Sequence, residues 1–419
     1  MKARLGWKGL KAEEYVDDGY ALLSTPNIKG REIDFENVNF ITRERYVESP
    51  EIMLREGDVL LTKDGFTLGT TNVVRRLPRP TTLNGSIALI RPKPPLNSVF
   101  LYYLLASDFF QYLVHLMKDG MDILHLFQAD LRHFDVLLPP LSEQAQIASF
   151  LDQRTAAIHS LIAKKERLIE LLQDERQALI TQAVTKGLDP NVPMRDSGVS
   201  WLGVIPASWD ALPLRRLITR IEQGWSPSCD STPAADGAWG VLKAGCTAGG
   251  VYQWAENKAL PPSEMPRTAI EVHPGDLIMS RASGSPHIVG SCATVTEAPV
   301  RLMLSDKHFR LRVEPLKAVV AFLCLALGSR PARCQIEVSI SGAEGLANNL
   351  PQSELKSVVL AMPPVAEQQA IAAFLYGTLA RHDDVVRRLT LSAERLREYR
   401  QALITAAVTG KIDVSREAA

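Results

Sequence analysis

Apolar residues recur at alternating steps of three and four along two stretches of the chain, one near its middle and one near its C-terminal end. This spacing is typical of a helix that buries one stripe of its surface against another helix. In the first stretch the stripe consists of Ile147, Leu151, Ile158, Ile162, Ile169, Leu172 and Leu179. In the second stretch it is interrupted at His382, is weakened at Ala393 and otherwise consists of Ile371, Leu375, Val386, Leu396 and Leu403. We predict two long helices that pair along these stripes.

The two stretches are copies of one sequence. "QALITQAVTKG" starts at Gln177 and "QALITAAVTGK" starts at Gln401, an offset of 401 − 177 = 224 residues. "LPPLSEQAQIASFLD" from Leu138 matches "MPPVAEQQAIAAFLY" from Met362 at the same offset, without an insertion or deletion between the matched ends. A helix of about 45 residues is roughly 65 Å long and is marginal on its own. We therefore expect the two copies to pack as an antiparallel coiled coil.

The segments that precede the two helices also resemble each other, at offsets that drift. "GDVLLTKDG" from Gly57 resembles "GDLIMSRASG" from Gly275, and "GWKGLKA" from Gly6 resembles "AWGVLKA" from Ala238. Short strands are expected in "DVLLT", "NVVRR" and "SIALIRP" of the first segment and in "DLIMS", "CATVT" and "FRLRVE" of the second. An apolar helix is expected late in each segment, and the order of the strands stays open.

These patterns predict an α+β fold with a pseudo-twofold repeat, in which two mixed α/β domains alternate with the two long helices. The expected boundaries are 1–138 and 191–362 for the domains, 139–190 and 363–414 for the helical segments, and 415–419 for a tail. The second domain has a lead-in from Trp201 to Trp239, whereas Trp7 stands almost at the start of the chain. We therefore expect the first domain to be N-terminally shortened.

Composition and charge restrict the class of protein. The chain has 419 residues with 46% hydrophobic residues, which fits two or three folded domains. Its formal net charge is +0, so any binding of nucleic acid depends on local patches. Five cysteines without a CxxC pair indicate a reduced, cytoplasmic protein without structural zinc. The apolar runs are shorter than a membrane span, and no signal peptide is indicated.

Candidate catalytic chemistry is weak throughout the sequence. The glycine-rich stretches "KDGFTLGTTN" and "RASGSPHIVGS" lack phosphate-loop spacing. They fit either exposed loops whose glycines allow close approach to something flat or grooved, or ordinary hairpin turns. Asp236 with "ENK" at 256–258 mimics a nuclease set by chance, and no methyltransferase motif is present. His125 and His133 are expected to be packing or surface residues, so no catalytic or metal-binding residue is predicted.

The paired "PP..EQ..IA.FL" and "QALIT.AVT" helices resemble those of the specificity subunit of type I restriction-modification systems. "DSGVSWLGVIPASWDALPLRRL" from Asp196 is similar to the opening of that family's second target recognition domain, and "NIKGREIDFENVNFITRERY" from Asn27 is similar to the interior of one. The resemblance covers essentially the whole chain. The alternative is a coiled-coil scaffold protein that does not read DNA.

The resemblance implies a non-catalytic subunit in which each domain reads one half of a bipartite double-stranded DNA site in the major groove. The helices would set the spacing and bind two modification subunits, which methylate adenine with S-adenosylmethionine. Restriction subunits would join with ATP and Mg, and this chain would bind no cofactor of its own. Base edges in the major groove distinguish all four base pairs, so a few contacts in each half-site suffice.

Cations near the matched "GD" strands are the candidate DNA-binding residues. Lys63 and Arg281 follow these strands and have small polar neighbours, whereas Arg75 and Arg76 belong to a cluster that a solvated face explains equally well. The secondary candidates are Lys11 and Lys243, at matched positions, and Lys307.

Overall fold

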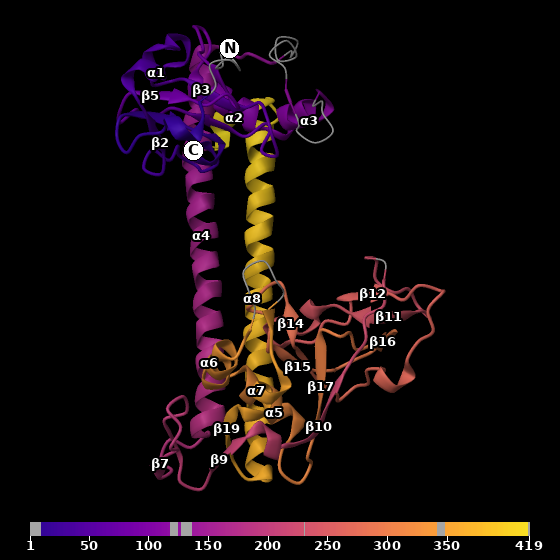
Figure 1. Cartoon of the computed structure of the whole chain (residues 1–419). Helices are drawn as coiled ribbons and strands as arrows, with labels where there is room; N and C mark the ends of the chain where they lie inside the picture. The colour runs from indigo at the N-terminus through magenta and orange to yellow at the C-terminus, as the bar shows by residue number, and fades with distance from the viewer. Residues whose placement is uncertain (1–9, 118–124, 127–135, 230, 342–347, 418–419) are drawn as a thin grey trace. The chain divides into compact units, whose positions relative to one another are not determined.

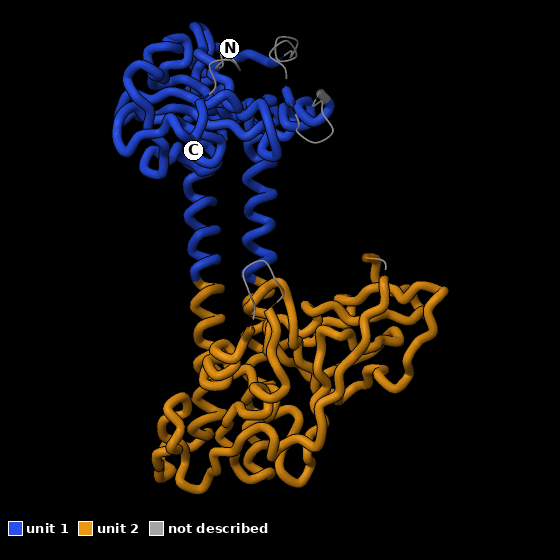
Figure 2. Tube along the Cα trace, in the orientation of Figure 1, with its two compact units in different colours: residues 1–167, 389–419 blue, residues 168–388 orange. Residues whose placement is uncertain are grey.

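The computed structural model describes residues 10–117, 125–126, 136–229, 231–341 and 348–417. Trp7 and His133 lie outside the described residues. The chain divides into two compact units, residues 1–167 with 389–419 and residues 168–388 (Figure 2). The boundary between the units falls within the two long helices rather than at their ends.

The two long helices are α4 (Leu141–Lys186) and α8 (Val365–Val408) (Figure 1). Gly187 and Gly410 follow them with φ of +77° and +70°, the left-handed conformation that commonly ends a helix. Every residue of the two predicted apolar stripes is buried or half-buried. The small Ala393, 2% exposed, is among the most buried positions of α8.

Ion pairs show that the two helices run antiparallel. In the first unit, Arg397 of α8 pairs with Glu166 of α4. In the second unit, Arg176 of α4 lies 3.5 Å from Asp383 of α8. Each unit therefore contains the N-terminal half of one helix and the C-terminal half of the other. The predicted antiparallel pairing is confirmed within each unit.

The first domain contains two small sheets, in the orders β2-β1-β5 and β4-β3-β6. The strands of these sheets are β1 (Tyr20–Leu23), β2 (Asn39–Ile41), β3 (Val59–Thr62), β4 (Thr71–Val73), β5 (Thr81–Leu83) and β6 (Ile87–Ile90). The helices of the first unit besides α4 and α8 are α1 (Arg43–Val47), α2 (Ser98–Ala106), α3 (Asp108–Met117) and α9 (Val414–Glu417).

The second domain repeats this arrangement. Strand β13 lies between β15 and β17 as β3 lies between β4 and β6, and β11 lies between β12 and β16 as β1 lies between β2 and β5. Both β1–β5 and β11–β16 are parallel, and both β1–β2 and β11–β12 are antiparallel. These strands are β11 (Trp239–Leu242), β12 (Asn257–Ala259), β13 (Leu277–Ser280), β15 (Cys292–Thr294), β16 (Arg301–Met303) and β17 (His308–Val313).

The second domain also has strands of its own, several of them in the lead-in before Trp239. Strand β10 extends the sheet next to β17, and the pairs β7–β8, β9–β19 and β14–β18 complete the set. The bounds of these strands are β7 (Met194–Asp196), β8 (Val204–Pro206), β9 (Asp210–Pro213), β10 (Ile218–Gln223), β14 (Ala282–Ser283), β18 (Asn348–Asn349) and β19 (Val359–Met362). The helices are α5 (Val320–Gly328), α6 (Arg330–Val338) and α7 (Gln352–Ser357).

The apolar helix of each domain packs between its sheet and the long helices. In the first unit, Phe100 of α2 shares a core with Leu151 of α4 and Val408 of α8. In the second unit, Phe322 of α5 shares a core with Leu375 of α8 and Val184 of α4. Burial of aromatic and aliphatic side chains is the main stabilising contribution here.

Within the described residues, no single helix is long and apolar enough to cross a membrane. The helical segments Ser98–Ala106 and Asp108–Leu116, which meet at a bend of 61°, are long and apolar enough only when they are taken together. The five cysteines all lie among the described residues, and none of them forms a disulfide bond.

Candidate nucleic-acid interface

The aspartate of each matched "GD" sequence is buried beneath the strand that it begins. Asp58 accepts a hydrogen bond from the Arg55 backbone N–H at 2.8 Å and pairs with Arg91 at 2.6 Å. Asp276 accepts from the His273 backbone N–H at 3.0 Å and pairs with Arg312 at 2.8 Å. The carboxylate thus closes a turn and binds an arginine that lies in the neighbouring strand or directly after it. The repeated "GD" therefore marks a structural contact rather than a DNA-facing one.

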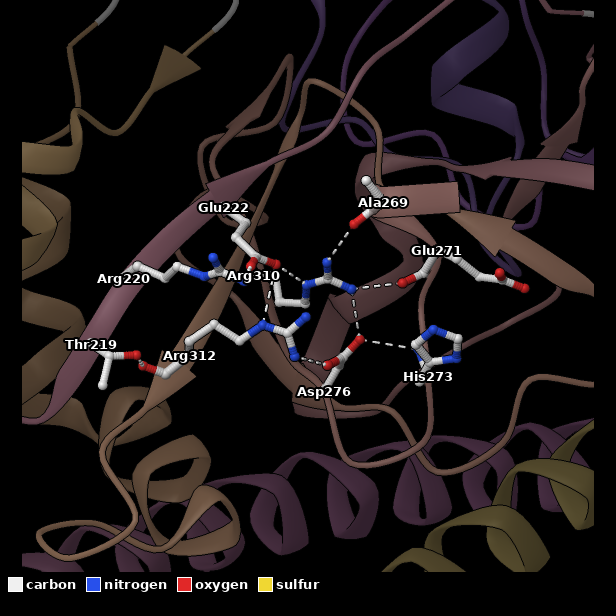
Figure 3. A network of polar contacts seen from close by, with 9 residues as sticks. All are labelled: Thr219, Arg220, Glu222, Ala269, Glu271, His273, Asp276, Arg310 and Arg312. Atoms are coloured by element: carbon white, nitrogen blue, oxygen red, sulfur yellow. Dashed lines mark hydrogen bonds and ion pairs between the residues drawn. The ribbon is translucent and has the colours of Figure 1, made fainter. Parts of the chain in front are cut away.

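The second domain builds a larger network on this contact (Figure 3). Arg310, 2% exposed, donates to Asp276 and to the backbone oxygens of Glu271 and Ala269 at 2.6–3.1 Å. It also pairs with Glu222, which comes from β10 and so from the lead-in. Burial favours the neutral form of Glu222, but hydrogen bonds from Arg312 and Arg310 outweigh it and hold the pKa of this carboxyl below its usual value.

Lys63 and Arg281, the two main candidates for DNA contact, come directly after β3 and β13. Both side chains are held by contacts to nearby residues. Lys63 pairs with Asp64 at 2.7 Å, and Asp64 lies 2.9 Å from His125. Arg281 donates twice to the Asn349 side-chain oxygen, at 3.1 and 2.6 Å. These contacts fix the position of each cation at the base of its loop.

The guanidinium of Arg281 is also held by an aromatic ring. Its central carbon lies 5.3 Å from the centre of the Phe309 ring, within the range of a cation–π contact. Phe309 belongs to β17, the strand next to β13. Side chains of two strands, Phe309 of β17 and Asn349 of β18, therefore orient Arg281.

The glycines that end these loops approach the domain's own helices. Gly69 and Gly290 have φ of +86° and +79°. A Cβ at Gly69 would lie 2.5 Å from Gln111, and a Cβ at Gly290 would lie 2.4 Å from Ile336. The close approach that these two glycines allow is thus to α3 and α6, whereas a Cβ at Gly65 or Gly284, in the same two stretches, would have nothing within 4 Å.

The remaining candidate cations divide into two groups. Arg75 forms a bidentate pair with Asp152 of α4, at 2.8 and 2.7 Å, and its guanidinium lies 5.9 Å from the Tyr102 ring centre. Both terminal nitrogens are thus used to join the first domain to α4, a role that the sequence analysis missed because the two partners are far apart along the chain. The exposed or half-buried candidates are Lys11, Lys243, Lys307 and Arg76.

Two candidate kinds of catalytic site, a metal site and the nuclease-like set at Asp236 and 256–258, can be compared with the described residues. No group of three or more His, Cys, Asp or Glu side chains among the described residues could hold a metal ion. In the chance nuclease set, the Glu256 backbone oxygen accepts from the Lys243 N–H at 2.9 Å, and Asn257 is buried. These contacts give that segment a structural role in the β11–β12 sheet.

Known proteins resemble this chain in sequence. A family model described as the type I restriction modification DNA specificity domain matches residues 16–171. The type I restriction enzyme EcoEI specificity subunit of Escherichia coli is 30% identical over 244 residues, which are 58% of this chain and 40% of that protein. The EcoKI specificity subunit of Escherichia coli (strain K12) is 22% identical over 413 residues, which are 97% of this chain and 85% of that protein.

The fold has a counterpart among solved structures. A chain from a structure described as "Structural basis underlying complex assembly and conformational transition of the type I R-M system" superposes with a TM-score of 0.68. The superposition covers 94% of this chain and 92% of that chain at 17% sequence identity, so it concerns the fold alone.

Two repeated α/β domains on a shared pair of long helices, together with these matches, define a non-catalytic protein that carries DNA specificity. The chain belongs to the family of specificity subunits of type I restriction-modification systems.

Proposed function

We propose that each of the two domains reads one half of a bipartite double-stranded DNA site in the major groove. The observation that carries this proposal is the repetition of the same sheet order, the same buried aspartate and the same cation-bearing loop in both units. Two equivalent readers suit a target with two separated parts. The antiparallel helix pair then acts as the ruler that sets the number of base pairs between them.

The loops that carry Lys63 and Arg281 are the proposed reading elements, and Lys11, Lys243, Lys307 and Arg76 are proposed contacts to phosphates. Arg281 retains N–H donors beyond the two that bind Asn349, because a guanidinium has five. A bidentate contact to a base edge discriminates by about 1–3 kcal/mol. Phosphate contacts would make the affinity depend on salt concentration.

The repeat also supports two equivalent docking positions for modification subunits. Leu161 of α4 and Val385 of α8 stand at matching places in the two helix copies, and each is 44% exposed. An exposed apolar side chain at the same place in each unit suits two copies of one partner. We propose that these partners use S-adenosylmethionine to methylate adenine, and that restriction subunits join with ATP and Mg.

The proposal predicts the outcome of co-expression with the modification subunit of the same system, followed by single-molecule sequencing for methylated adenines. A two-part motif that appears only with this chain is expected. Arg281→Ala should relax one half-site by about tenfold or more while the other half stays intact, and Lys63→Ala should relax the opposite half. An unchanged motif in both variants would contradict the loop assignment, and no motif despite a formed complex would indicate a scaffold without DNA readout.

A further inference from the structure

The "QALIT" sequence makes one and the same contact in both units. In the first unit, the side-chain amide of Gln401 donates to the Ala106 backbone oxygen at 2.7 Å, and the Thr405 hydroxyl accepts from the Asp108 N–H at 2.9 Å. Ala106 ends α2 and Asp108 begins α3. Because Gln and Thr are four residues apart, they lie on one face of α8 and reach the junction together.

The second unit repeats this contact with the other long helix. Gln177 of α4 donates to the Gly328 backbone oxygen at 3.1 Å, and the Thr181 hydroxyl accepts from the Arg330 N–H at 3.1 Å. Gly328 ends α5 and Arg330 begins α6. Helix ends leave backbone groups without a partner inside the helix, and these side chains supply one. We call the two sets, Gln401 with Thr405 and Gln177 with Thr181, the junction contacts.

The opposite ends of α2 and α5 are held by a second repeated glutamine. The Gln144 side-chain oxygen accepts from the Asn97 N–H at 2.8 Å, and the Gln368 side-chain oxygen accepts from the Val319 N–H at 2.8 Å. The amide of each glutamine also donates to two backbone oxygens, at 2.8–3.0 Å. Both glutamines are 0% exposed. In each unit, one long helix therefore holds the N-terminal end of the apolar helix, and the other long helix holds its C-terminal end.

In each unit, a side chain of the helix that follows the junction, α3 or α6, contacts the proposed reading loop. Gln111 of α3 donates to the Gly69 backbone oxygen at 2.9 Å, and Arg333 of α6 donates to the Val289 backbone oxygen at 2.7 Å. Gly69 ends the loop that starts at Lys63, and Val289 lies at the end of the loop that starts at Arg281. The long helix of each unit is thus joined to the loop by a hydrogen bond at the start of α3 or α6 and by a second one from a side chain of that same helix.

We infer that the junction contacts are positioning residues, which set where each reading loop stands on the helix pair and so limit the number of base pairs tolerated between the half-sites. The inference rests on the proposed function. Successive base pairs are about 3.4 Å apart along DNA, so a loosened junction would let a loop reach the neighbouring register. The bases read inside each half-site would stay the same, because the loop itself is unchanged.

The two units differ in how much else supports the junction. In the first unit, Asp152 binds both Arg75 and the Tyr103 hydroxyl, the latter at 2.7 Å. In the second unit, Tyr376 takes the place of Asp152 in the repeat, and it lines a cavity of about 790 Å³ together with Cys324. Loss of the junction contact should therefore have the larger effect in the second unit.

The experiment uses the complex of this chain with its modification subunits and DNA duplexes that carry the two half-sites at the native spacing or one base pair longer or shorter. Gln177→Met with Thr181→Val removes the second junction contact with little change in volume, and Gln401→Met with Thr405→Val is the matched change in the first unit. We expect the ratio of methylation rates at native and altered spacing to fall about tenfold for the second-unit variant, and less for the first.

Two results separate this role from a purely structural one. Discrimination against single base changes within each half-site should match that of the unmodified protein, and Thr181→Ser, which keeps the hydroxyl, should keep the native spacing ratio. An unchanged ratio in both double variants, or an equal loss of methylation on every duplex, would overturn the inference. If a double variant does not fold, Thr181→Val compared with Thr181→Ser gives the same test. Absence of two-part methylation by the unmodified complex would instead refute the proposed function.

Discussion

Arg310 is the most deeply buried arginine contact of the second domain, and it shows how one residue can join three segments. It binds Glu222 of β10, Asp276 at the start of β13 and two backbone oxygens near β16. A guanidinium buried to this depth is costly unless its donors are satisfied by charged or polar partners. In the first domain, Arg91 binds Asp58 and one backbone oxygen, that of Met53. The second domain has a further carboxylate, that of Glu222, because it has the further strand β10.

The lowered pKa of Glu222 predicts a dependence of stability on pH. Its ionised form is favoured in the folded protein relative to the reference value of 4.5. The stabilisation is therefore present above pH 4.5 and is lost as the pH falls through the lower pKa of the folded state. Glu222→Gln should reduce the free energy of unfolding at pH 7 and should flatten its decline below pH 4.5. Urea unfolding at a series of pH values measures both effects.

Glu264→Gln is a matched control for this prediction, because Glu264 lies on an exposed part of the same domain. It should leave both the free energy of unfolding at pH 7 and its slope with pH unchanged. Equal slopes for Glu222→Gln and the unmodified protein would show that the network does not retain the Glu222 charge.

In the loops after β3 and β13, packing against a helix limits the size of the side chain at the glycine that ends each loop. Gly290→Ala should destabilise the second unit by about 2–4 kcal/mol, because a Cβ would meet the buried Ile336 at 2.4 Å in addition to the strain of a left-handed residue. Gly275→Ala, at φ +91° with nothing within 4 Å, isolates the strain and should cost about 1–2 kcal/mol. Chemical denaturation compares the two variants, and equal losses would refute the packing argument.

Elements of local origin were predicted well. The long helices, the strands after "GD" and the apolar helices α2 and α5 all appear as expected, because periodicity and end signals depend on near neighbours. The strand order did not follow from sequence, since β1 pairs with β5, and β11 with β16, although other strands of the same domain lie between them along the chain. Such parallel pairs depend on packing between distant segments.

At the scale of the whole molecule, each compact unit takes half of each long helix, so the repeat in sequence becomes a repeat of two assemblies. This arrangement predicts the stoichiometry of partner binding. Leu161→Glu and Val385→Glu should each leave one modification subunit bound instead of two, and the double variant should bind none, because a charge would replace an apolar contact at one equivalent position in each unit. Mass measurement of the purified complex by light scattering counts the subunits.

Leu391→Glu provides the control for that count. Leu391 is 43% exposed, close to the value for Leu161, but its counterpart in the other helix copy is Arg167. A position without an apolar counterpart is not expected to take part in a contact made twice. Loss of a subunit in this variant would argue against two equivalent docking positions.

By itself, the sequence determined the repeat, the paired helices with their ends and the family, because each of these is written in the spacing or identity of residues near one another. The tertiary structure decided which groups the repeated residues contact. The glutamine and threonine of "QALIT" meet backbone groups up to 297 residues away, and Arg75 meets Asp152 from a separate element. Nothing in local spacing specifies such partners, since they become neighbours only when packing brings the domain and the long helices together within each unit.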